Sequence, residues 1–242
     1  MIRLIAFLLL LPITAQATCR QALALGRDMS TSVDAVEYRL QLDGLAAALT
    51  SQPVQDVIFA QPEAPIRIAV YEWSGPPNQT LILPWTTLRQ PADLDAAVAV
   101  LRAHERVVAA PTTAIGSALL YGFSLLETQN DCWKRTLDLS GDGETNTGPP
   151  PEHISSAQAP AGVIVNGLVI GAGSAGGDDH RFADIKALTA YYSRNVVRGP
   201  GAFVEVALGF EDYAAAMERK LLRELASIAI GRIDASQSQV KR

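Results

Sequence analysis

Three oxygen-bearing side chains lie at alternate positions directly after the first apolar segment of the chain: Asp28, Ser30 and Ser32. A carboxylate and two hydroxyls are hard oxygen donors, which Mg²⁺ and Mn²⁺ prefer as ligands. The same residue types also cap the first N–H groups of helices. Alone, the segment therefore fits a helix N-cap as well as it fits a metal site.

Two other segments supply oxygen donors of the same kind. Thr112 and Thr113 open a helical pattern, and Asp142 follows the strand-like run Arg135–Leu139. With only two formal negative charges around it, a dication would stay electrophilic and keep one position for an anionic oxygen from outside the chain. The sequence therefore predicts carboxylate recognition through Mg²⁺ or Mn²⁺, held by Asp28, Ser30, Ser32, Thr113 and Asp142.

The elements that must position these donors alternate between strands and helices. Strand patterns cover Arg20–Arg27, Ile66–Trp73, Thr80–Trp85, Arg135–Leu139, Val163–Ile170 and Ala202–Leu208. Helical patterns cover Val33–Leu49, Ala92–Val108, Thr113–Leu126, Phe182–Asn195 and Tyr213–Ile228, with a short helix at Glu152–Gln158. This order predicts an α/β fold with a mostly parallel sheet, helices on both faces and a hairpin of the second and third strands. Ligands of such sheets bind beyond the C-terminal ends of the strands, where the donors are predicted to lie.

The composition is that of a globular chain with a modest negative charge. Of 242 residues, 48% are hydrophobic and 19% charged, so the chain can bury a large core. A formal net charge of −5 with no long basic run argues against nucleic acid or an anionic membrane as the main partner. Because no linker divides the sequence, we expect one domain over residues 18–242, with a frayed polar tail at 236–242.

Residues 1–17 have the pattern of a secretory signal peptide. Arg3 precedes an apolar stretch that is too short to span a membrane, and Ala15-Gln16-Ala17 forms a small-residue cleavage site. Cleavage after Ala17 predicts a periplasmic or secreted protein, and no later apolar run approaches the ~20 residues of a membrane span. An uncleaved anchor and a buried first strand are the alternatives. Lipidation of Cys19 is disfavoured, because it needs a small residue where Thr18 stands.

The three donor segments together resemble the metal-ion-dependent adhesion site (MIDAS) of von Willebrand factor type A (VWA) domains. They are Asp28-Met29-Ser30-Thr31-Ser32, Thr113-Ala114-Ile115-Gly116-Ser117-Ala118-Leu119 and Ser140-Gly141-Asp142-Gly143. The resemblance implies a Rossmann-like, doubly wound sheet with one short antiparallel edge strand. It also implies a non-enzymatic binding module that uses Mg²⁺ or Mn²⁺ to grip a carboxylate of a protein partner. Phrases such as Val33-Asp34, Tyr38-Arg39 and Asn166-Gly167-Leu168 resemble an uncharacterised group of secreted bacterial VWA-like proteins.

Two residues depart from the pattern of that family. Arg27 stands before Asp28 where VWA domains usually have an apolar residue, and Thr112 stands where a Gly commonly precedes the metal-binding Thr. An Arg that paired with Asp28 would weaken metal binding. Alternation along a strand, however, predicts that the two side chains point to opposite faces.

The sheet order implied by the resemblance also predicts a disulfide between Cys19 and Cys132. In that order the strands before Asp28 and Asp142 are parallel neighbours, and the two cysteines precede their aspartates by nearly equal numbers of residues. Both cysteines are therefore expected at the same end of the sheet, opposite the metal-binding rim. Export to an oxidising compartment would allow the bond to form.

Other chemistries have weaker support. The segment Asp28-Met29-Ser30 is similar to the nucleophile loop of aspartate-dependent phosphatases, but Ser30 replaces their acid–base carboxylate. A metal-dependent phosphohydrolase and a metal-independent scaffold with a vestigial site remain the alternative functions. Gly171–Gly176 matches the dinucleotide pattern G-x-G-x-x-G, yet its strand comes late, no acid follows at the expected distance, and no helix is predicted to open directly after it. No metal-ligand spacing connects His104, His153 and His180.

Overall fold

The computed structural model describes residues 19–106, 110–171 and 178–226. The predicted signal peptide at 1–17 and the tail at 236–242 lie outside these residues, as does most of the glycine-rich segment 171–176. Among the described residues, none of the helices has the length and apolar character needed to cross a membrane.

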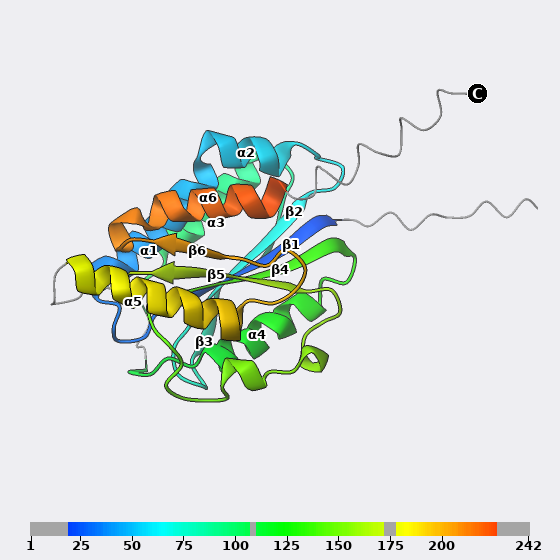
Figure 1. Ribbon diagram of the computed structural model, residues 1–242. Helices are drawn as coiled ribbons and strands as arrows, with labels where there is room; N and C mark the ends of the chain where they lie inside the picture. Colours follow the sequence, from blue (N-terminus) through cyan, green and yellow to red (C-terminus); the bar gives the residue numbers. More distant parts are fainter. Residues whose placement is uncertain (1–18, 107–109, 172–177, 227–242) are drawn as a thin grey trace, which may run out of the picture.

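The fold is built on a six-stranded sheet with the order β3-β2-β1-β4-β5-β6 (Figure 1). Only β2 and β3 pair antiparallel, which confirms the predicted hairpin, and every other neighbouring pair is parallel. The edge strand β3 is longer than the predicted Thr80–Trp85 run. It accommodates Pro84 because an edge strand has N–H positions that need no partner. The strands are β1 Cys19–Asp28, β2 Ile66–Trp73, β3 Gln79–Leu88, β4 Cys132–Gly141, β5 Ile164–Ile170 and β6 Val204–Ala207.

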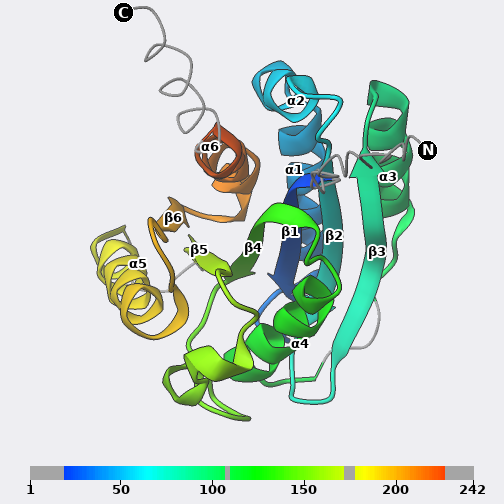
Figure 2. The same cartoon turned by 90° about the vertical axis from the view of Figure 1, so that its right-hand side faces the viewer.

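Helices cover both faces of the sheet, as Figure 2 shows. One core lies under α1, α2, α3 and α6 and takes Leu23 and Leu25 from β1, whereas the other lies under α4 and α5 and takes Ala22 and Ala24. This division follows from the two-residue period of a strand. The helices are α1 Ala35–Thr50, α2 Gln52–Phe59, α3 Pro91–Ala103, α4 Ile115–Glu127, α5 Asp178–Tyr191 and α6 Tyr213–Ala226.

The short helical turns complete the list of elements. They are the 3₁₀ turns η1 Pro151–His153, η2 Ser156–Gln158 and η4 Phe210–Asp212, and the π-helical turn η3 Tyr192–Val196.

Several predicted boundaries differ from the observed ones. The sequence did not predict α2, which is only eight residues long and too short for a clear helical period. The predicted helix Ala92–Val108 ends at Ala103, and the predicted helix Glu152–Gln158 is two 3₁₀ turns. The expectation that no helix opens directly after the glycine-rich segment is wrong, because α5 starts at Asp178.

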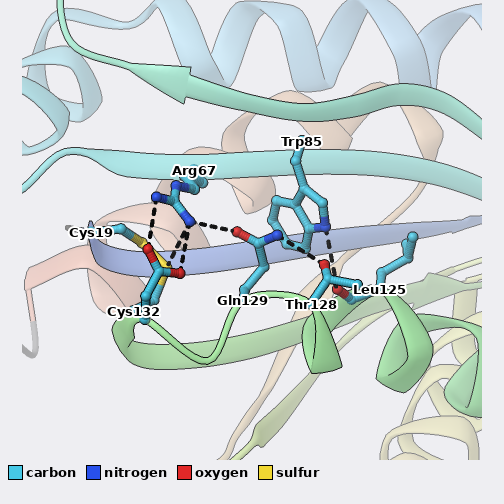
Figure 3. Close-up of a disulfide and its surroundings, with 8 residues drawn as sticks. Cys19, Arg67, Trp85, Leu125, Thr128, Gln129 and Cys132 are labelled. Atoms are coloured by element: carbon cyan, nitrogen blue, oxygen red, sulfur yellow. Dashed lines mark hydrogen bonds and ion pairs between the residues drawn. A yellow bond between two sulfur atoms is a disulfide. The ribbon is translucent and has the colours of Figure 1, made fainter. Parts of the chain in front are cut away.

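A disulfide joins Cys19 to Cys132 at the N-terminal end of the sheet (Figure 3). The two residues are register partners in the parallel pair of β1 and β4, with their Cα atoms 4.5 Å apart. Arg67 of β2 lies beside the bond and forms a two-armed ion pair with Asp131, at 2.9 and 3.0 Å. The predicted disulfide is therefore confirmed, and the strand order that the resemblance implied is what brings the cysteines together.

Candidate metal site

A residue outside the segment Asp28–Ser32 caps the N-terminus of α1. Asp34 does so, because its Oδ1 accepts hydrogen bonds from the backbone N–H groups of Val36 and Glu37, while Glu37 accepts one from the backbone N–H of Asp34. This is a complete capping box. The oxygens of Asp28, Ser30 and Ser32 are therefore not needed to begin the helix, and the N-cap interpretation of the segment is wrong.

Asp28, Ser30, Ser32 and Asp142 lie together beyond the C-terminal ends of β1 and β4. The two serine hydroxyls are 2.9 Å apart, and the Ser32 hydroxyl donates to Oδ1 of Asp142 at 3.1 Å. The backbone N–H of Ser30 donates to Oδ1 of Asp28 at 2.8 Å, which turns this carboxylate toward the loop. A chain of hydrogen bonds through Ser30 and Ser32 thus joins the ends of two central strands.

Thr113 reaches this rim through the turn that carries Asp142. Its backbone N–H donates to Oδ1 of Asn146 at 2.9 Å, and its carbonyl accepts hydrogen bonds from the backbone N–H of Asn146 and the hydroxyl of Thr145. A Cβ atom added to Gly143 would lie 4.0 Å from the Thr113 hydroxyl. The sequence did not reveal the roles of Thr145 and Asn146, which fix the position of Thr113. Their place in the polar turn after Asp142 was the signal that could have revealed them.

The carboxylates of Asp28 and Asp142 each keep one oxygen without a partner. Oδ2 of both residues is buried and receives no hydrogen bond from the described part of the chain. Burial, reinforced by the negative charge of Asp142, raises the pKa of Asp28 to about 7, and burial also raises the pKa of Asp142. A bound dication would satisfy both oxygens, so the donor set fits Mg²⁺ or Mn²⁺. No three His, Cys, Asp or Glu side chains converge among the described residues, so this site depends on hydroxyls for its remaining ligands.

Tyr192 is a neighbour that the sequence did not reveal. Its hydroxyl is fully buried, has no hydrogen-bond partner among the described residues, and would lie 2.5 Å from a Cβ atom on Gly141. The same Cβ atom would lie 3.2 Å from Oδ2 of Asp28, so only glycine fits between the two groups. Tyr192 begins the π-helical turn η3, a local irregularity that is frequent at functional sites and has no sequence pattern of its own.

Arg27 does not pair with Asp28. Its Nη1 lies 3.2 Å from Oε1 of Glu72, and its guanidinium stands 5.4 Å from the centre of the Tyr38 ring, within the core under α1. Alternation along β1 thus separates Arg27 from Asp28, as predicted. The first departure from the VWA pattern leaves the carboxylate free for a metal.

We expect Asp28→Asn to stabilise the metal-free protein. Because the pKa of Asp28 lies near 7 in the folded chain and near 3.8 otherwise, the folded state binds more protons between these values, and stability falls as the pH rises through them. The neutral amide removes this cost and can donate a hydrogen bond toward Asp142. The free energy of unfolding in EDTA should rise by about 1 to 3 kcal/mol at pH 8 and change little at pH 4.

Urea unfolding at the two pH values measures this difference. Asp95→Asn, at an exposed position of α3, serves as the matched control and should have no effect at either pH. If Asp28→Asn were less stable than the wild type in EDTA at pH 8, the assigned cost of the buried, charged Asp28 carboxylate would be contradicted.

Residues 18–229 match the family described as "Protein of unknown function (DUF1194)". The chain belongs to this family. No curated protein matches the sequence.

Solved structures show that this DUF1194 chain has a VWA-like fold. One of them is a von Willebrand factor type A domain from Catenulispora acidiphila, which is 12% identical with a TM-score of 0.53 and is matched over 87% of this chain and 43% of that chain. Proximal thread matrix protein 1 (PTMP1) from the mussel byssus is 16% identical with a TM-score of 0.58, over 86% of this chain and 48% of that one. The pilus adhesin SpaC from Lactobacillus rhamnosus GG is 15% identical with a TM-score of 0.57, over 87% of this chain and 30% of that one.

These relatives are longer proteins, of which the DUF1194 chain spans half or less. A further PTMP1 structure has a zinc-occupied MIDAS motif.

Proposed function

We propose that this DUF1194 protein is a metal-dependent binding module that grips an acidic group of a protein partner. Asp28, Ser30, Ser32, Thr113 and Asp142 would hold Mg²⁺ or Mn²⁺ in a MIDAS-type site. The observation that carries the proposal is that Asp28 and Asp142 each keep one buried, unpartnered oxygen among the described residues, while their other oxygens accept hydrogen bonds from Ser30 and Ser32. When bound, the metal would supply an electrophilic centre with a position for an outside carboxylate.

The assignment to binding is supported by the residues around the site and by the relatives. The segment that resembles a phosphatase loop has no second carboxylate at Ser30, so a general acid–base for phosphoryl transfer is missing from it. PTMP1 is a thread matrix protein and SpaC is an adhesin, and both share this fold. The Cys19–Cys132 disulfide fits export to the periplasm or the exterior, with residues 1–17 as the signal peptide.

The test is isothermal titration of the disulfide-bonded protein with Mg²⁺ and with Mn²⁺. Asp142→Ala should lose more affinity than the ~10–100-fold typical of an outer-shell change, because it removes one of two negative charges. Ser30→Ala and Ser32→Ala, which remove neutral donors, should each lose about tenfold or less. Asp95→Ala, an exposed carboxylate on α3, is the control and should bind like the wild type.

Three results would count against the proposal. If all site variants bind Mn²⁺ like the wild type, the ligand assignment is wrong. If neither metal gives heat or shifts the melting temperature of the wild type, the protein is a metal-independent scaffold. If the protein hydrolyses generic phosphoesters with Mg²⁺ and Asp28→Asn abolishes this turnover, it is an enzyme rather than a binding module only.

A further inference from the structure

A pocket lies close to the candidate metal site. It has a volume of about 330 Å³ and lies between the first turn of α1 and the C-terminal end of α3 with the residues that follow. Its size suits a side chain or a small charged group rather than a whole domain. The polar residues that line it are Arg39, Arg102, His104, Glu105 and Arg106.

Arg106 connects this pocket to the metal-binding loop. Its Nη2 donates to the backbone carbonyls of Met29 and Ser30, both at 3.3 Å. The same guanidinium stands 5.7 Å from the centre of the Tyr38 ring, which forms one wall of the pocket. A ligand in the pocket would therefore contact a side chain that touches the loop carrying Ser30.

The pocket carries positive charge that the described residues neutralise only in part. Arg39 is already bound, to Asp43 at 2.6 Å and to the backbone carbonyl of His104 at 3.1 Å. Among the described residues, no carboxylate forms an ion pair with Arg102 or with Arg106. Of the described residues that line the pocket, the exposed Glu105 alone is acidic.

Glu72 contacts the pocket residue His104 from the protein interior, and its negative charge is already paired with Arg27. It is completely buried and accepts from Arg27 at 3.2 Å, and its other oxygen lies 3.4 Å from Nε2 of His104. The pocket is therefore a cationic depression on a chain whose net charge is −5. Guanidinium groups bind carboxylates in a two-armed geometry, which makes an acidic side chain the ligand that fits best.

We propose that this pocket binds a second carboxylate of the partner, through Arg102 and Arg106, next to the one at the metal. The ligand would be an acidic peptide segment with at least two carboxylates. The inference rests on the proposed function for the first of them, whereas the arginine pocket needs no metal. Linking the two contacts on one chain increases the affinity without any additional contact, because the second binding step becomes intramolecular.

The test uses a fluorescent hexaglutamate peptide and the full disulfide-bonded protein, at low ionic strength, once with Mg²⁺ and once with EDTA. The variant Arg102→Gln/Arg106→Gln should bind the peptide about tenfold or more weakly in Mg²⁺, since it loses charge-assisted hydrogen bonds. The wild type should bind the peptide more weakly in EDTA than in Mg²⁺. In EDTA, the variant should bind the peptide more weakly still. The affinity of the single variant Arg102→Gln for Mg²⁺ itself, measured by calorimetry without peptide, should stay unchanged, because Arg102 does not contact the metal-binding loop among the described residues.

Two further variants control for charge and for folding. Arg89→Gln removes an exposed positive charge at the opposite end of α3, on the order of 17 Å from Arg102, and should not change peptide binding. Arg102→Gln alone changes an exposed side chain that forms no ion pair with the described residues, and should weaken the binding about threefold.

The outcomes separate the two proposals. If the wild type binds no Mg²⁺ but binds hexaglutamate in EDTA and the arginine variants do not, the pocket stands and the metal function fails. If the arginine variants bind the peptide like the wild type under both conditions, or if the wild type binds no peptide at all, the pocket proposal is wrong.

Discussion

Replacing Lys220 by Met is expected to lower the free energy of unfolding by about 3 to 5 kcal/mol. Lys220 is completely buried, and its Nζ lies 2.8 Å from Oδ2 of Asp138 and 2.6 Å from Oε1 of Glu224. Both carboxylates are buried as well. Without the ammonium group, two acidic side chains would share a site that water does not reach, which is the costly way to break a buried ion pair.

Asn166 and Lys134 also contact Glu224 in this cluster. The side-chain amide of Asn166 donates to Oε1 of Glu224 at 2.6 Å, and its oxygen accepts the backbone N–H of Phe203. Lys134 donates to the backbone carbonyl of Glu224 from the outer side of the cluster. The network thus joins α6 to strands β4 and β5 and to Phe203, the residue before β6, and Lys220 is the cation at its centre.

The destabilisation should depend on pH with a definite sign. Burial, with Lys220 opposing it and Glu224 adding to it, raises the pKa of Asp138 to about 7 in the intact protein. Removing Lys220 raises this pKa further, so the folded variant binds more protons than the unfolded chain and loses stability as the pH rises. The loss should therefore be smaller at pH 5 than at pH 8.

Urea unfolding at both pH values measures the effect. Lys186→Met replaces an exposed lysine of α5 and should change stability by less than about 0.5 kcal/mol. A Lys220→Met protein as stable as the wild type at pH 8 would show that the cluster is not a paired charge network.

Removing the disulfide should have an effect of similar size. The Cys19–Cys132 bond closes a loop with a sequence separation of 113 residues. A loop of this length corresponds to about 4.7 kcal/mol in the chain-entropy estimate, and native disulfides of small exported domains are typically worth about 2 to 5 kcal/mol. We expect the variant Cys19→Ala/Cys132→Ala to lose a free energy of unfolding in that range.

Reduction of the wild type provides the matched control. A thiol reductant should lower the urea midpoint of the wild type toward that of the double variant and leave the variant unchanged. Mass spectrometry of the oxidised protein should find no alkylatable thiol. Two free thiols, or a reductant that does not affect the wild type, would contradict the role of the bond.

The sequence by itself determined the class of fold and predicted which polar residues meet at one rim of the sheet. Periods of two and of about four residues follow from strand and helix geometry, and they predicted the six strands and most of the helices. Asp28, Ser30, Ser32 and Asp142 were found because a parallel sheet brings the ends of its strands to one rim. The periods of strands and helices and the positions of strand ends are local features of a sequence, so these predictions needed no knowledge of contacts between distant residues.

Only the tertiary structure decided what each polar residue faces. In the sequence, Lys220 belongs to an amphipathic helix, and nothing nearby reveals that Asp138 of β4 lies against it. Arg106 and Tyr192 likewise reach the rim from the end of α3 and from a π-helical turn. Burial and charge pairing depend on residues far apart in the chain, and a periodic pattern contains no information about which of them meet. The cationic pocket and the buried charge network therefore became visible only when the helices were packed on the sheet.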